Sequence, residues 1–127
     1  MAASQAKPLF WVGSAKESLL AFPDEVRREV GYALYLAQTG RKHVTAKPLR
    51  GFGGAGVLEI IEDHDGSTYR TVYTVKLADA VYVLHAFQKK SRRGIETPKQ
   101  EMDIVRERLR RARQHHATLA LEKRGGR

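Results

Sequence analysis

A run of cations follows directly on an apolar stretch in the last third of the sequence. The stretch "VYVLHAF" (81–87) has strand character, and the cations are Lys89, Lys90, Arg92 and Arg93. Arginine forks and lysine ammonium groups both bind phosphate oxygens. A solvated basic loop has the same composition, so the run alone leaves phosphate binding and plain solubility equally open.

Three apolar segments upstream of this run predict an antiparallel meander of strands. They are Val57–Glu62, Ser67–Lys76 and Ala80–Phe87, joined by "DHDG" and "LADA". The first connection is either a two-residue turn at Asp65-Gly66 or a four-residue loop starting at Asp63. The two resulting registers differ by two residues and therefore place the same side chains on the same face. Only a β-bulge would change that assignment.

This register places Glu59, Arg70 and His85 on one face of the predicted sheet, with Lys89 next in alternation beyond Phe87. An acid, a guanidinium, an imidazole and a lysine could together position a phosphodiester, neutralise its transition state and move protons without a metal. Each residue also has a plainer interpretation. Glu59 and Arg70 can be a cross-strand ion pair, and His85 a partly buried histidine.

The opposite face of the predicted sheet is apolar and would seat amphipathic helices. Its members are Leu58, Ile60, Tyr73, Val75, Tyr82, Leu84 and Ala86. A short strand over Pro8–Val12 and a helix over Ala15–Ala21 are predicted first, the helix starting with a Ser-x-x-Glu capping box at Ser14. A second helix has Pro23 at its first helical position and ends at Gly40.

The glycine-rich segment Gly40–Gly56 is predicted to be a loop that contributes Lys47 and Arg50 as candidate phosphate contacts. It lacks the P-loop pattern, and a flexible linker is the plainer interpretation. A last helix is predicted from a Thr-x-x-Gln capping box at Thr97, with Pro98 as its first residue. Beyond about His116 the chain is expected to fray.

Length and composition indicate one domain over residues 1–127, with a core of about 8–116 and a basic tail of 117–127, and the predicted strands and helices make it α+β. The chain is 42% hydrophobic and has no cysteine, which favours a reducing, cytoplasmic setting and excludes a cysteine-based zinc site. No signal-like or membrane-spanning apolar run is present. Residues 1–88 hold 10 Lys/Arg against 9 Asp/Glu, and residues 89–127 hold 13 against 5. The excess of positive charge therefore lies in the last third of the chain, which favours a polyanionic partner.

The order of elements, with the stretches "LEI" (58–60), "YRTVYTV" (69–75) and "LHAFQKKSRRGIETPKQE" (84–101), resembles the phage-derived, HigB-like branch of the RelE/ParE toxin superfamily. The resemblance implies a RelE-like fold: a small antiparallel sheet in the order β-α-α-β-β-β, followed by a C-terminal helix. It also implies a toxin of a type II toxin–antitoxin system that cuts mRNA on the ribosome and inhibits translation. The partners it implies are that mRNA and a small helix-turn-helix antitoxin.

The resemblance further implies roles for individual residues. Arg70 matches the family arginine at the scissile phosphate, Lys89 and Lys90 match the basic end of the last strand, and Glu59 lies in the "LEI" strand. The reaction implied is attack of the ribose 2′-OH on the adjacent phosphate, with no metal or other cofactor. His85 is the candidate acid or base. The candidate RNA contacts are Lys47, Arg50, Arg92 and Arg93.

Two other functions fit the same sequence. A ParE-like toxin of the same fold would bind DNA gyrase and cut nothing. A non-enzymatic basic module would bind nucleic acid or an antitoxin. Only Phe87 adjoins the basic run, which is poor in the stacking aromatics that favour single-strand binding.

Overall fold

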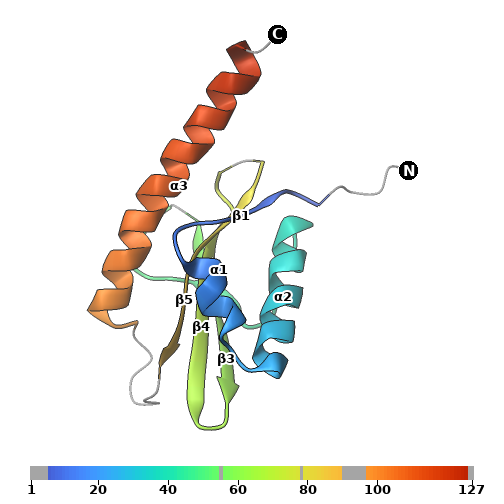
Figure 1. The fold of residues 1–127 in the computed structure, drawn as a ribbon, viewed down its shortest axis with the longest axis vertical. Coiled ribbons are helices and arrows are strands. Elements are labelled where there is room, and N and C mark those ends of the chain that lie inside the picture. Colours follow the sequence, from blue (N-terminus) through green and yellow to red (C-terminus); the bar gives the residue numbers. More distant parts are fainter. Residues whose placement is uncertain (1–5, 55, 78, 90–96, 126–127) are drawn as a thin grey trace.

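The fold is a five-stranded sheet with helices on both faces (Figure 1). The computed structural model describes residues 6–54, 56–77, 79–89 and 97–125. The elements are β1 (Leu9–Trp11), α1 (Ala15–Leu20), α2 (Asp24–Gln38), β2 (Ala46–Pro48), β3 (Val57–His64), β4 (Ser67–Thr74), β5 (Val81–Lys89) and α3 (Lys99–Gly125). The sheet order is β1-β5-β4-β3-β2, with β1 parallel to β5 and the other pairs antiparallel. The α+β class is confirmed, and β2 adds a strand inside the predicted loop.

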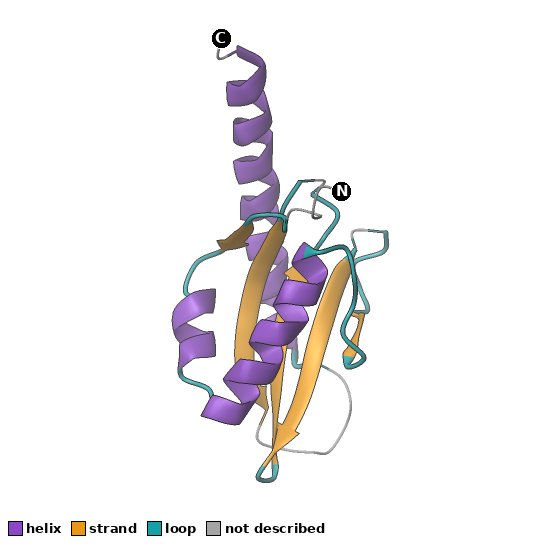
Figure 2. Cartoon of the chain, turned by 90° about the vertical axis from the view of Figure 1, so that its right-hand side faces the viewer, coloured by secondary structure: helices purple, strands orange, loops and turns teal. Residues whose placement is uncertain are grey.

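Two separate cores lie on the two faces of the sheet. Helices α1 and α2 cover one face, and the first half of α3 covers the other (Figure 2). The α1/α2 core includes Val30, Ile60 and Tyr73, whereas the α3 core includes Val72 and Val105. The C-terminal turns of α3 project beyond the sheet (Figure 1). The predicted charged face is therefore covered by a helix and is not open to solvent.

The hairpin between β3 and β4 has the shorter of the two predicted connections. Asp65 and Gly66 have φ values of 47° and 82°, the left-handed conformation that a two-residue hairpin turn requires at both positions. Ile61 consequently pairs with Arg70, as this register predicts. Arg70 in turn pairs with Phe87, which confirms the predicted register at this end of the second hairpin.

A β-bulge in β5 changes the predicted faces. Val72 pairs with His85, but the next residue of β4, Tyr73, pairs with Val83, so Leu84 is the extra residue. The inserted residue reverses the alternation on its N-terminal side. Tyr82 and Leu84 therefore pack in the α3 core, and Val83 packs in the α1/α2 core, opposite to the prediction for all three.

The first helix starts at Ala15 as predicted, but the predicted capping at Ser14 and the predicted places of Pro23 and Pro98 were wrong. Ser14 makes no capping side-chain bond to the described residues of α1, and its Oγ instead accepts a hydrogen bond from Arg108 (3.0 Å). Pro23 is the residue before α2 and not its first helical residue, because its ψ of 152° is extended. Likewise α3 begins at Lys99, after Pro98.

The helix ends agree with prediction for α2 and not for α3. Gly40 follows the end of α2 with a φ of 84°, the left-handed conformation expected after a helix terminus. Helix α3 continues to Gly125, past the predicted fraying point. The sequence "ATLALEK" (117–123) consists largely of strong helix formers, which accounts for the extension. None of the described helices has the length and apolar character needed to span a bilayer.

Candidate active site

Arg70 and Glu59 form a buried ion pair. The Arg70 Nη1 lies 3.3 Å from both carboxylate oxygens of Glu59, and the two residues are 4% and 2% exposed. Thr97, just before α3, completes the network: its hydroxyl accepts from Arg70 (3.2 Å) and donates to Glu59 (3.0 Å). Strand alternation alone also allows an exposed ion pair, whereas the pair in the structure is buried. Removing one partner would leave a desolvated charge.

The strand register arranges the predicted site residues in rows across the α3 face. One row joins Lys47 of β2 to Glu59, then Val72, then His85. The next row contains Arg70, between Ile61 and Phe87. A third row ends at the half-buried Lys89, which pairs with Thr68. Successive rows are about 7 Å apart along the strands, so Lys89 lies one row beyond Arg70 and two beyond Glu59.

A pocket of about 460 Å³ opens beside the buried pair. Its lining residues are Lys47, Pro48, Leu49, Arg50, Glu59, Thr97 and Met102. The predicted phosphate contacts Lys47 and Arg50 are both exposed, and they share this pocket with the carboxylate of Glu59. The structure thus brings cations from the glycine-rich segment to the partners of Arg70. A phosphodiester could bind there with its ribose next to a carboxylate.

His85 is held in one tautomer by α3. Arg108 donates to its Nδ1 (3.3 Å), so the proton is on Nε2, which lies 2.6 Å from the Glu101 carboxylate. The ring stacks on Phe87 and is 6% exposed. Burial is the main cause that lowers the pKa of His85; Arg108 also lowers it, and Glu101 opposes the shift. His85 is therefore a neutral imidazole covered by a helix.

Three of the predicted site residues lie outside the described residues, namely Lys90, Arg92 and Arg93. Among the others, Glu59 and Arg70 are in direct contact, and Lys47 and Arg50 share the pocket with Glu59. His85 lies in the same row as Glu59 but bonds to α3 instead.

Sequence reasoning missed the three residues that α3 and its start bring to this face. Thr97 was assigned to a helix cap, and it binds Arg70 and Glu59 instead. Glu101 and Arg108 are seven residues apart and flank the buried Val105 on one helical face. The sequence signal that could have identified Glu101 and Arg108 is their seven-residue spacing beside the apolar stripe of the helix.

Much of the positive charge of α3 is exposed and paired along the helix. Lys99 and Arg106 both contact Asp103, and Arg110 contacts Glu107. The hydrogen bond from Lys99 is the main cause that lowers the pKa of Asp103. Such exposed pairs contribute little to stability, so this surface is available for a polyanion.

The fold is of the RelE class. A mutant of the E. coli toxin RelE in the free state aligns with a TM-score of 0.53 and 18% identity, over 84% of this chain and 98% of that one. The RelBE2 toxin–antitoxin complex from Mycobacterium tuberculosis aligns with a TM-score of 0.46 and 18% identity, over 68% and 94% of the two chains. The predicted RelE-like fold is confirmed.

Residues 17–110 match the family described as "Phage derived protein Gp49-like (DUF891)", and the chain belongs to this family. The predicted resemblance to a phage-derived family is thereby confirmed, whereas the HigB-like branch stays a prediction. No curated protein matches the chain.

Proposed function

We propose that this protein is the toxin of a toxin–antitoxin pair and an endoribonuclease that cuts mRNA on the ribosome. Membership of the phage-derived family and a fold shared with the toxin RelE support the toxin assignment. The concentration of positive charge after residue 88 supports an RNA substrate. An antitoxin, proposed to be a small helix-turn-helix protein, would neutralise it in the cytoplasm.

The observation that carries the proposal is the pocket in which Glu59 lies beside Lys47 and Arg50. The two exposed cations would bind the phosphate oxygens on either side of the cut. Arg70 and Thr97 hold the buried Glu59 by three hydrogen bonds to its oxygens, so the carboxylate has a fixed direction. A fixed carboxylate next to a bound ribose is suited to act as a general base.

In the proposed reaction Glu59 takes the proton of the 2′-OH, and the 2′-oxygen attacks the adjacent phosphorus. The bond from phosphorus to the 5′-oxygen breaks, and that oxygen takes up a proton from water. Lys89 lies two rows beyond Glu59, so Lys89 and Lys90 are proposed to bind a more distant phosphate of the same RNA. The products are a 2′,3′-cyclic phosphate and a 5′-OH. Among the described residues that line the pocket, only Glu59 is a carboxylate, whereas a two-metal nuclease needs several, which supports chemistry without a metal.

Arg70 and His85 have different proposed roles in this scheme. Arg70 keeps Glu59 oriented, and it contacts the scissile phosphate only after exchanging its bonds to Glu59 and Thr97. His85 is separated from the pocket by its bonds to Glu101 and Arg108, so its use as an acid or base requires movement of α3.

That same burial favours a second candidate function. If Arg70 and His85 stay covered, the protein is a non-cutting basic module or a gyrase-binding toxin, and the two buried networks serve only stability. The two candidates differ in what happens to RNA during growth arrest.

The test is expression without the antitoxin, followed by primer extension on a translated message. The parent and the Lys47→Ala/Arg50→Ala variant are compared with Lys16→Ala/Arg28→Ala, which removes two exposed cations from α1 and α2. Discrete cuts are expected from the parent and the control, and at least about tenfold fewer from the pocket variant. Intact message with stalled replication would instead support gyrase binding.

A further inference from the structure

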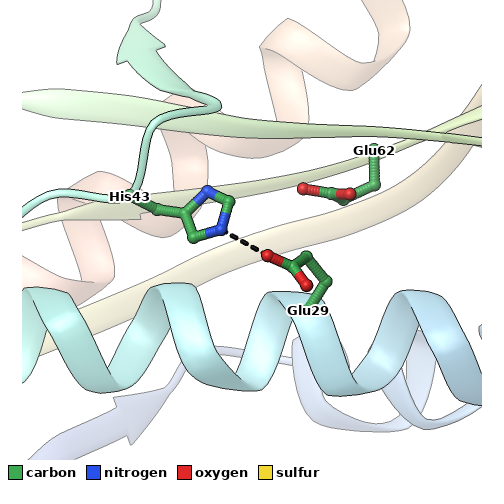
Figure 3. Close-up of side chains that lie close together, drawn as sticks. All are labelled: Glu29, His43 and Glu62. Carbon is green, nitrogen blue, oxygen red and sulfur yellow. Dashed lines mark hydrogen bonds and ion pairs between the residues drawn. The ribbon is translucent and has the colours of Figure 1, made fainter.

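Three potential metal ligands meet on the sheet face opposite the candidate active site (Figure 3). Glu29 comes from α2, His43 from the segment between α2 and β2, and Glu62 from β3. One ligand atom of each lies within 4.8 Å of the other two. Glu62 is three residues after Glu59 on a regular strand, so alternation directs it to the other face. The cluster is therefore independent of the proposed reaction.

His43 is the buried centre of this cluster, at 5% exposed. Its Nε2 lies 2.5 Å from the Glu29 carboxylate. Its Nδ1 has two neighbours, both from Thr45: the hydroxyl at 2.9 Å and the backbone N–H at 3.1 Å. The Thr45 hydroxyl donates its own hydrogen to Glu62 at 3.0 Å.

In the structure, Nδ1 accepts from the Thr45 N–H, and the proton on Nε2 is donated to Glu29. A second state becomes favourable once a cation replaces the contact with Glu29. Nδ1 then donates to the Thr45 hydroxyl, which passes its hydrogen to Glu62, and the Nε2 lone pair faces the cation. The second state is the arrangement of a metal-binding histidine, whose other ring nitrogen donates to a neighbouring oxygen.

We propose that Glu29, His43 and Glu62 bind a divalent first-row transition metal, with zinc as the representative ion. One imidazole nitrogen and two carboxylate oxygens, completed by water, match zinc, which takes three protein ligands at its open sites. Magnesium and calcium prefer all-oxygen sites with more ligands. On binding, Nε2 gives up its hydrogen bond to Glu29 and its proton, and Nδ1 takes up a proton in exchange, so the ring stays neutral.

The geometry needs only side-chain movement to receive the ion. Bonds of about 2.0–2.2 Å in a tetrahedral site keep ligand atoms about 3.3–3.5 Å apart. The 2.5 Å contact between His43 and Glu29 must lengthen, and the side chain of Glu29 is 45% exposed and can rotate. The bound metal would join α2, the segment before β2, and β3.

The direct test is titration of the full chain, without a histidine tag, by Zn²⁺ in calorimetry and by Co²⁺ in absorption spectroscopy. One equivalent of Zn²⁺ should bind, and Co²⁺ should give the visible bands of a low-coordinate nitrogen and oxygen site. Glu29→Gln, Glu62→Gln and His43→Gln should each weaken binding at least tenfold. His64→Gln is the matched control, because His64 lies on β3 outside the cluster and should leave binding unchanged.

A second readout keeps the proposal testable if His43→Gln fails to fold. Zn²⁺ in hundredfold excess over its dissociation constant should raise the Tm of the parent by about 5 °C or more, and Mg²⁺ should not. Glu29→Gln, with its half-exposed side chain, should fold and lose that increase. Absence of a stoichiometric zinc site in the parent, or equal binding by Glu29→Gln, would overturn the proposal and leave a proton-sharing cluster.

Discussion

The two faces of the sheet each hold a buried histidine whose Nε2 is bonded to a glutamate, but the two rings are fixed differently. His85 faces Glu101 at 2.6 Å, and His43 faces Glu29 at 2.5 Å. A cation, Arg108, holds Nδ1 of the first ring, whereas Thr45 holds Nδ1 of the second. Because a guanidinium can only donate, Nδ1 of His85 must accept, whereas the Thr45 hydroxyl can accept a hydrogen from Nδ1 of His43 once Nε2 is released from Glu29.

The two faces also differ in whether arginines hold their buried groups. On the α3 face, Arg70 and Arg108 each hold a buried acidic or imidazole group, and Arg108 reaches the Leu84 carbonyl and Ser14 as well. The cluster on the other face contains no arginine among its described hydrogen bonds. On the α3 face, the arginines hold their partners in fixed positions. On the other face, Nε2 of His43 can release its proton and bind a metal instead.

The largest expected effect is that of Arg70→Ala, which breaks the arginine-held face. It leaves Glu59 buried without its cation, so the free energy of unfolding should fall by about 3–5 kcal/mol. Cutting should fall about a hundredfold, because Glu59 loses its orientation and the phosphate its guanidinium. Urea unfolding measures the loss of stability, and primer extension measures the loss of cutting. Arg28→Ala, at an exposed position of α2, is the control for each.

A double variant separates stability from cutting at this pair. Replacing both charges with apolar residues, in Arg70→Met with Glu59→Leu, should return stability to within about 1 kcal/mol of the parent, because no unpaired charge stays buried. Cutting should stay low. Recovery of cutting in the double variant would show that neither charge takes part in the reaction.

Arg108→Met should have the next largest effect on stability. It removes the cation from Nδ1 of His85, which then resembles His43 in having no described arginine partner. It removes hydrogen bonds to the His85 ring, the Leu84 carbonyl and Ser14 while keeping much of the side-chain volume. The expected loss is about 2 kcal/mol of unfolding free energy. Nitrogen chemical shifts from NMR should show Nδ1 of His85 unprotonated in the parent. Its protonation should begin at higher pH in the variant, because Arg108 lowers the pKa of His85.

The sequence was sufficient to predict local pairing and insufficient for what depends on tertiary contacts. The Asp65-Gly66 turn and the pairing of Arg70 with Phe87 follow from turn chemistry and strand period, which are local. The bulge at Leu84 has no signal in residue types, and it reversed the faces predicted for its N-terminal neighbours.

The candidate active site was easier to predict from the sequence than the candidate metal site, again because sequence patterns report only local structure. Glu59 and Arg70 come from adjacent strands, so alternation alone places them together. Glu29, His43 and Glu62 come from a helix, a loop and a strand, and no periodicity relates them. The covering of Arg70 and His85 depends on how α3 docks, which its apolar stripe does not specify from sequence.

Acid should weaken the protein through His85, and the direction follows from its lowered pKa. Burial lowers the folded-state pKa below the unfolded value of 6.5, so below that pH the unfolded chain binds a proton that the folded chain does not. The unfolding free energy contributed by His85 is therefore complete above pH 6.5 and declines as the pH falls toward the folded pKa.

The acid effect is measured as the change in stability between pH 7.5 and pH 5.5, in the parent and in His85→Gln. The variant should lose less stability than the parent over this interval. Because Glu101 raises the pKa of His85, Glu101→Gln should extend the acid loss to lower pH. Equal losses in the parent and in His85→Gln would mean that His85 is not the neutral, desolvated group described above.

The smallest expected effect on stability is that of Thr45→Val, which makes His43 resemble His85. Valine keeps the shape of threonine and removes the hydroxyl that lies between His43 and Glu62, at a cost of about 1 kcal/mol. Nδ1 then has only the backbone N–H of residue 45 as a partner, so the ring keeps its proton on Nε2. Zinc affinity, measured by calorimetry, should fall about tenfold although no ligand is changed, because the hydroxyl that would accept the Nδ1 proton is gone. If Thr45→Val binds zinc as tightly as the parent, the choice of tautomer does not govern the site, and the contrast between the two histidines lies in their solvent access alone.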